Sequence, residues 1–165
     1  MITLIANTKG GVGKTSLATS ILAALAKDKG VVGVDLDSVN KAASAEWSKN
    51  RTEIDGKFYF LSGDVRDQIT KIASDYDEVV IDAGGFDNTE YRQAISVADV
   101  ILIPLLVGST SNIEGLRKVA ETIEQMRPDN LPKVYSVVTK AHHHTSSPEL
   151  KRAITKIINN KLVKP

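Results

Sequence analysis

The chain of 165 residues contains no cysteine, which excludes disulfide bonds, thiolate zinc sites and cysteine-held iron–sulfur clusters within it. Neither sign of charge is in excess, because 21 Lys and Arg residues offset 20 Asp and Glu residues to a net charge of +1. Overall charge therefore indicates no DNA or membrane partner, and such a contact would need a local patch. Long apolar runs are also missing. The longest, 100–107, falls far short of the roughly 20 residues that a membrane-spanning helix needs.

What remains is an ordinary globular composition, with 42% hydrophobic and 25% charged residues. The first residues reach Lys9 without the apolar region and small-residue cleavage site of a signal peptide. A chain of this length can bury a substantial core as one unit. We therefore expect a single domain over residues 1–165 that is soluble and cytoplasmic.

Short apolar runs alternate with helical patterns along the chain. Most of the runs are continuous, which predicts strands buried on both faces, as in a parallel sheet. The expected strands are 2–6, 31–35, 58–61, 79–82, 100–105 and 134–139, and the expected helices are 14–27, 41–49, 65–75, 90–98, 113–126 and 148–159. This alternation predicts an α/β fold, a doubly wound and mostly parallel sheet with helices on both faces.

A glycine-rich segment lies between the first expected strand and the first expected helix, where a phosphate-binding loop must be placed. Backbone N–H groups there would face the anion, the Lys14 ammonium would reach the β- and γ-phosphates, and the Thr15 hydroxyl would bind Mg²⁺. A turn that merely caps a helix would not need Gly-Lys-Thr after an apolar strand. The predicted nucleotide-binding residues are Lys9, Gly10, Gly11, Val12, Gly13, Lys14, Thr15 and Ser16.

Three acids stand at or just after the ends of expected strands, the edge where open α/β sheets bind ligands. Asp35 and Asp37 follow one run, and Asp82 ends the run 79–81. Acids often finish strands simply as turn formers, but beside a phosphate-binding loop Asp82 is expected to hold Mg²⁺ through its water shell. The glycines Gly84 and Gly85 then give a segment able to respond to the γ-phosphate.

The phosphate-binding loop departs from the general pattern in two places. Thr8 stands where a glycine is usual, and a second lysine, Lys9, precedes Gly10. The arrangement Lys-Gly-Gly-x-x-Lys-Thr resembles the deviant Walker A motif of the ParA/MinD family of ATPases. The resemblance implies that Lys9 crosses the interface of an ATP-bound homodimer to the partner's phosphates, as an arginine finger would.

The same resemblance assigns roles to the first acid pair. It implies that Asp37 orients the attacking water and that Asp35 supports the Mg²⁺ shell, although the family usually has Pro-Gln after the second acid, where this chain has Ser38-Val39. An Asx turn or helix cap is the alternative for Asp37. The metal-binding residues are thus expected to be Thr15, Asp35 and Asp82, and the catalytic residues Lys9, Lys14 and Asp37.

The end of the last expected strand bears on the choice of base. Guanine readers place an acid near this point, whereas position 142 is histidine, so ATP is favoured over GTP, with Thr139 or Lys140 bordering the base. Family members are usually longer than this chain, with a further strand and a C-terminal helix often used for DNA binding. We expect those two elements to be missing from residues 1–165.

The leading hypothesis is a ParA-type ATPase that partitions or positions DNA cargo. The expected partners are a second copy, nonspecific DNA and a stimulating protein of the centromere-binding type, which would associate the chain with the nucleoid. The alternatives are a metabolic enzyme resembling dethiobiotin synthetase, a MinD-like positioning ATPase and a nucleotide switch without catalysis. A membrane-lying helix at 148–159 and a metal site in the histidine run 142–144 are both less favoured than a sheet-covering helix and a solvated loop.

Overall fold

A computed structural model describes residues 1–37, 57–106 and 112–140. Six strands form one sheet in which every neighbouring pair is parallel, in the order β3-β2-β4-β1-β5-β6. They are β1 (Ile2–Ile5), β2 (Val31–Asp35), β3 (Lys57–Phe60), β4 (Glu78–Asp82), β5 (Val100–Leu106) and β6 (Lys133–Thr139). All six predicted strands are confirmed, and no boundary differs by more than one residue.

The helices in the described residues are α1 (Lys14–Leu25), α3 (Val65–Asp75), α4 (Thr89–Val97) and α5 (Asn112–Met126). Four helix predictions are thereby confirmed, while those at 41–49 and 148–159 lie outside the described residues. Helix α4 begins one residue earlier than predicted because the Asn88 side chain accepts a hydrogen bond from the Tyr91 amide and caps it. Within the described part of the chain, no helix is both long and apolar enough to cross a bilayer.

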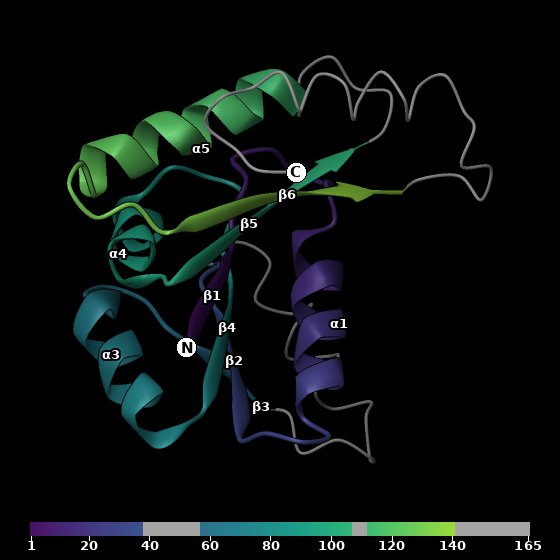
Figure 1. The fold of residues 1–165 in the computed structure, drawn as a ribbon, viewed down its shortest axis with the longest axis vertical. Coiled ribbons are helices and arrows are strands. Elements are labelled where there is room, and N and C mark those ends of the chain that lie inside the picture. The colour runs from purple at the N-terminus through teal and green to yellow at the C-terminus, as the bar shows by residue number, and fades with distance from the viewer. Residues whose placement is uncertain (38–56, 107–111, 141–165) are drawn as a thin grey trace.

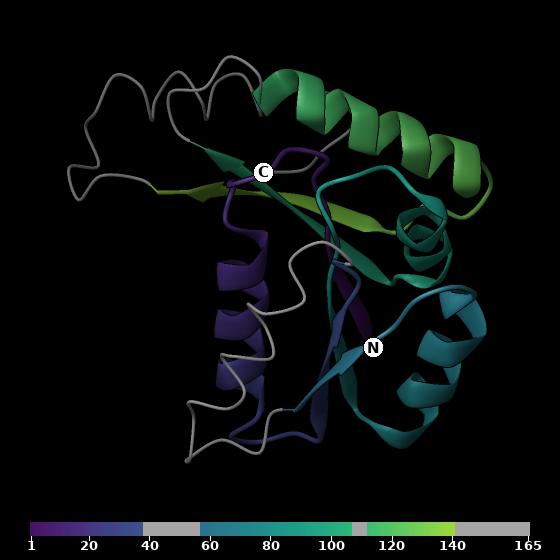
Figure 2. The ribbon, with the colours of Figure 1, turned by 180° about the vertical axis from the view of Figure 1, so that it is seen from behind.

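Helices cover both faces of the sheet (Figures 1 and 2). Helix α1 lies on one face, where Leu22 packs against Ile5 and Val80. Helices α3, α4 and α5 lie on the other face, over the larger apolar cluster that includes Leu4 and Ile81. Connections that run in opposite directions along the sheet therefore use opposite faces, as right-handed crossovers require. The predicted doubly wound α/β architecture is confirmed.

The strand register determines which strand ends meet. In the centre of the sheet, Ile5 at the end of β1 pairs with Asp82 at the end of β4. Asp82 in turn pairs with Asp35 at the end of β2. Because all strands are parallel, their carboxyl ends share one edge, and the segment after β1 starts beside both carboxylates.

The central strand offers a direct test of this core. Leu4 is fully buried between the two neighbouring strands of β1, so we expect Leu4→Ala to lower the free energy of unfolding by about 2–5 kcal/mol. Leu131, which is 61% exposed, provides the matched control, and Leu131→Ala should change that free energy by less than about 0.5 kcal/mol. Urea unfolding followed by circular dichroism measures both, and equal losses would contradict this account of the core.

Candidate nucleotide-binding site

The loop after β1 is anchored by a buried asparagine. Asn7 is fully buried, donates from Nδ2 to the Pro104 carbonyl (2.8 Å) and accepts at Oδ1 from the Lys9 amide (2.9 Å). Helix α5 packs closely on it, since a Cβ at Gly115 would lie 2.8 Å from Asn7 Oδ1. The start of the loop is thus fixed to β5 and α5. Asn7 was not among the predicted site residues, and its only sequence signal is a polar residue directly after an apolar strand.

Two glycines shape the outer turn of the loop. Gly11 and Gly13 have φ angles of 73° and 91°, in the region that disfavours other residues. Gly13 caps α1, which has neither a side-chain cap nor an acidic residue in its first turn. The first N–H groups of α1 and the positive end of its dipole therefore remain available to an anion.

Lys14 is buried at the beginning of α1, with only 8% of the residue exposed. Its Nζ donates to the Lys9 carbonyl at 3.0 Å, across the mouth of the loop. Burial lowers the pKa of the Lys14 ammonium, and the charges of Asp82 and Asp37 partly offset this effect. Because Asp82 and Asp37 offset the effect of burial only in part, this ammonium is suited to bind an anion in addition to these two carboxylates.

The carboxylates meet at the same place. Burial raises the pKa of Asp82 to about 6. The Thr15 hydrogen bond and the charge of Lys14 act to lower this pKa, while the charges of Asp35 and Asp37 raise it further. Asp82 Oδ1 is buried and has no hydrogen-bond partner among the described residues. The structure therefore keeps a carboxylate oxygen in position without satisfying it.

These residues fit a magnesium ion bound together with phosphates. Mg²⁺ is usually held by one or two carboxylates, water and substrate phosphates rather than by a full protein cage. Consistent with that, the described residues contain no group of three or more acidic, histidine or cysteine side chains arranged to hold a metal alone. The unsatisfied oxygen of Asp82, next to the Thr15 hydroxyl, provides the donors that such an ion would need.

The other predicted residues also lie near this edge. The Asp37 amide donates to Asp35 Oδ1 (2.8 Å), which turns the chain immediately after β2. The loop after β4 packs against that turn, since a Cβ at Gly84 would lie 3.5 Å from the Asp37 Cα. Ser16 is exposed on α1, and its carbonyl accepts a hydrogen bond from Ser20.

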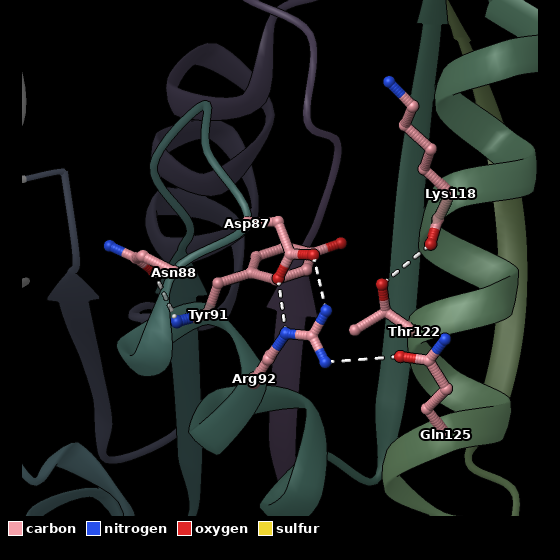
Figure 3. A network of polar contacts seen from close by, with 7 residues as sticks. All are labelled: Asp87, Asn88, Tyr91, Arg92, Lys118, Thr122 and Gln125. Carbon is pink, nitrogen blue, oxygen red and sulfur yellow. Dashed lines mark hydrogen bonds and ion pairs between the residues drawn. The ribbon is translucent and has the colours of Figure 1, made fainter.

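The loop after β4 is also connected to two helices. The Arg92 guanidinium on α4 binds both carboxylate oxygens of Asp87 (2.7 Å each) and donates to Gln125 on α5 (3.2 Å), as Figure 3 shows. A groove of about 440 Å³ lies between this loop and α5. Its lining includes Thr8, Phe86, Arg92, Lys118, Thr122 and Gln125. Because Thr8 belongs to the phosphate-binding loop, the groove opens beside the site.

The end of β6 touches the loop from its outer side. The Thr139 hydroxyl donates to the Val12 carbonyl (2.7 Å), and Lys140 Nζ donates to the Gly11 carbonyl (3.1 Å). A Cβ at Gly13 would lie 3.7 Å from the Thr139 side chain. Thr139 thus lies beside the phosphate-binding loop. The acceptors near its hydroxyl are backbone carbonyls, those of Val12 and, at 3.2 Å, Leu105.

Solved structures with this fold come from proteins of different kinds. A plasmid partition protein from Borrelia burgdorferi superposes with a TM-score of 0.70 at 18% identity, covering 98% of this chain and 86% of that one. Cobyrinic acid a,c-diamide synthase from Mycobacterium smegmatis, with a bound ATP analogue and magnesium, gives a TM-score of 0.73 at 17% identity, covering 98% and 83%. At these identities the likeness shows a shared fold.

Sequence comparison is more specific. The chain is 29% identical over 130 residues to the protein ParA of Rhizobium radiobacter, a match that covers 74% of this chain and 58% of that protein. It therefore spans little more than half the length of that curated relative. Residues 3–164, nearly the whole chain, match the family described as the CobQ/CobB/MinD/ParA nucleotide binding domain. Together with the loop, the buried lysine and the carboxylates, this match shows that the chain belongs to the CobQ/CobB/MinD/ParA family of nucleotide-binding domains.

Proposed function

We propose that the chain is a ParA-type ATPase that binds ATP with Mg²⁺, dimerises and hydrolyses the nucleotide slowly to partition or position DNA cargo. The observation that carries this proposal is the buried ammonium of Lys14, held on the Lys9 carbonyl and facing the carboxylates of Asp82 and Asp37. Such an arrangement supplies positive charge for phosphates and negative charge for a divalent cation at one strand edge.

Each residue of the site has a proposed role. Lys14 and the backbone N–H groups of the loop bind the β- and γ-phosphates, and Thr15 with Asp82 would hold Mg²⁺. When bound, that ion neutralises charge on the phosphates. Asp35 supports the ion's water shell, and Asp37 orients the attacking water. The contact of Asp37 with the loop after β4 supports this role, because the same loop reaches Lys14: a Cβ at Gly85 would lie 3.9 Å from Lys14 Nζ.

Lys9 is the residue that separates this proposal from a generic ATP-binding protein. It lies in the mouth of the loop, where its own carbonyl accepts from Lys14 and its amide donates to Asn7. With its backbone fixed by both contacts, its side chain can serve a second subunit's phosphates. The proposed partners are therefore a second copy in the ATP-bound state, nonspecific DNA and a stimulating protein of the centromere-binding type. The 29% identity to ParA supports this choice.

An ATP-dependent metabolic enzyme is the second candidate. It is favoured by the TM-score of 0.73 to a diamide synthase, a value similar to the 0.70 for a partition protein. Such an enzyme would need a small-molecule acceptor for turnover, and DNA would not stimulate it. Hydrolysis that requires an acceptor would therefore favour this candidate.

The two lysines of the loop test the proposed mechanism. We expect Lys14→Ala and Lys9→Ala each to lower the rate of ATP hydrolysis at least about 100-fold, because each removes positive charge from the transferring phosphate. Lys27→Ala, at an exposed position just after α1, is the control and should leave the rate unchanged. Phosphate release is measured with and without duplex DNA, and the mass of the ATP-bound form by light scattering.

Lys9→Ala should also abolish the ATP-dependent dimer, whereas Lys27→Ala should retain it. The proposal of a lysine acting in trans would be contradicted by two results together. These are a wild-type chain that stays monomeric with ATP and Mg²⁺, and unchanged hydrolysis in Lys9→Ala.

The raised pKa of Asp82 predicts that the nucleotide-free protein loses stability as this carboxyl group ionises. Because this pKa rises from 3.8 to about 6 on folding, the contribution of Asp82 to stability is full below about pH 4 and is lost as pH rises through 6. Asp82→Asn has no carboxyl group to ionise, so the variant does not lose this stability as pH rises. We expect the variant to be more stable than wild type by about 1–3 kcal/mol at pH 8, and nearly equal to it at pH 4.

Urea unfolding at the two pH values measures this difference, and exposed Asp129→Asn is the control. Added ATP and Mg²⁺ should stabilise wild type far more than Asp82→Asn, since the variant lacks the carboxylate. Equal stabilities at pH 8 would show that burial of the Asp82 charge has no cost.

A further inference from the structure

Thr139, the last residue of β6, and Lys140, directly after it, hold the outer turn of the phosphate-binding loop. They lie 127 and 129 positions away in the sequence from the residues that they contact. The Thr139 hydroxyl donates its one proton to the nearer of two carbonyls, that of Val12 (2.7 Å) rather than that of Leu105 (3.2 Å). Lys140 Nζ donates to Gly11, so two successive carbonyls of the turn are fixed. A third carbonyl, that of Lys9, accepts from Lys14. Among the described residues, the side chains that bond to the turn thus come from the end of β6 and the residue after it, whereas the side chain that bonds to the mouth of the loop comes from the start of α1.

Fixing a carbonyl also fixes the next N–H group. A trans peptide is planar and its C=O and N–H point in opposite directions, and the described residues contain no cis peptide. Hydrogen bonds to the carbonyls of Gly11 and Val12 therefore direct the N–H groups of Val12 and Gly13 away from β6. N–H groups of this turn are the ones through which a phosphate-binding loop contacts its anion.

The conformation of the β6 end indicates that the contact is built into the fold. Lys140 has a φ of 53°, and it is the one non-glycine residue with a positive φ in the described part of the chain. Such a conformation is disfavoured for a lysine and persists where its surroundings hold it. Thr139 adds packing to its hydrogen bond, because the Gly13 backbone lies in van der Waals range of its side chain.

We propose that Thr139 and Lys140 are positioning residues that keep the turn Gly11–Gly13 in its phosphate-binding shape and so set the affinity for the phosphate chain of the nucleotide. The inference rests on the proposed function in one respect, namely that this loop binds the phosphates of ATP. On this inference the Thr139 hydroxyl positions the loop and does not contact the base of the nucleotide.

A ligand that carries phosphates but no base distinguishes positioning of the loop by Thr139 from contact of Thr139 with the base. Calorimetric titration of the full chain with Mg–tripolyphosphate and with Mg–ATP gives both dissociation constants. Thr139→Val keeps the branched shape and removes the hydroxyl, and should weaken both ligands about five- to tenfold, as loss of one hydrogen bond implies. Thr139→Ser keeps the hydroxyl and should bind both ligands as tightly as wild type. Thr70→Val, which removes an exposed hydroxyl bonded to a carbonyl within α3, is the matched control and should change neither.

Lys140→Met should likewise weaken both ligands, by about two- to fivefold because its hydrogen bond is exposed. Lys133→Met, at the start of β6, controls for the lost charge and should have no effect. The melting temperatures of the ligand-free variants distinguish a purely structural role of these residues from a positioning role. A purely structural role would lower the melting temperature and leave both dissociation constants unchanged, and this result would overturn the inference.

The remaining outcomes are also decisive. Weaker binding of ATP with unchanged binding of tripolyphosphate in Thr139→Val would place Thr139 at the base and overturn the inference, while the proposed function would stand. If the wild-type chain bound neither ligand, the phosphate-binding function would fail, and the inference with it. Weakened binding of both ligands, rescued by Thr139→Ser, would support the inference even if hydrolysis and dimerisation were absent.

Discussion

The pairing of Ile5 with Asp82 at the centre of the parallel sheet is the constraint on which the site depends. It places the start of the phosphate-binding loop beside a buried carboxylate, and the pairing of Asp82 with Asp35 adds the second acid from the next strand. A slip of one residue would reverse the facing of every side chain on the strand and separate these groups. The apolar runs that specify the register therefore also specify the chemistry.

Charge is arranged at this edge at some cost to the folded chain. Burial lowers the pKa of Lys14 and raises that of Asp82 to about 6, so both charged forms are disfavoured by their surroundings. The two groups neutralise each other only in part, because burial shifts the pKa of each more than the opposite charge offsets. Phosphates bound with a divalent cation would complete it from both sides. Perturbed pKa values of this kind gather at functional sites because the charges are set for a ligand.

Much of this could be predicted from the sequence, because the decisive signals are local. Buried parallel strands appear as continuous apolar runs, and Gly-Lys-Thr after such a run indicates a phosphate-binding loop. The contacts made by Asn7, Gly115 and Thr139 could not be predicted, since each joins segments that only the completed sheet brings together. Their residue types carry little signal alone: an asparagine after a strand, a glycine in a helix and a threonine at a strand end are all common.

The fold by itself does not choose between a partition ATPase and a synthetase, because proteins of both kinds superpose on this chain about equally well. The choice depends on the residues of the loop. An ATP-dependent synthetase needs a second substrate close to the γ-phosphate, whereas an ATPase that works as a dimer needs a cation from its partner there. Lys9 is the residue that we propose for the second need. The contacts to Asn7 and Lys14 fix the backbone of Lys9, and under the proposed function its side chain would then reach the phosphates of the second subunit.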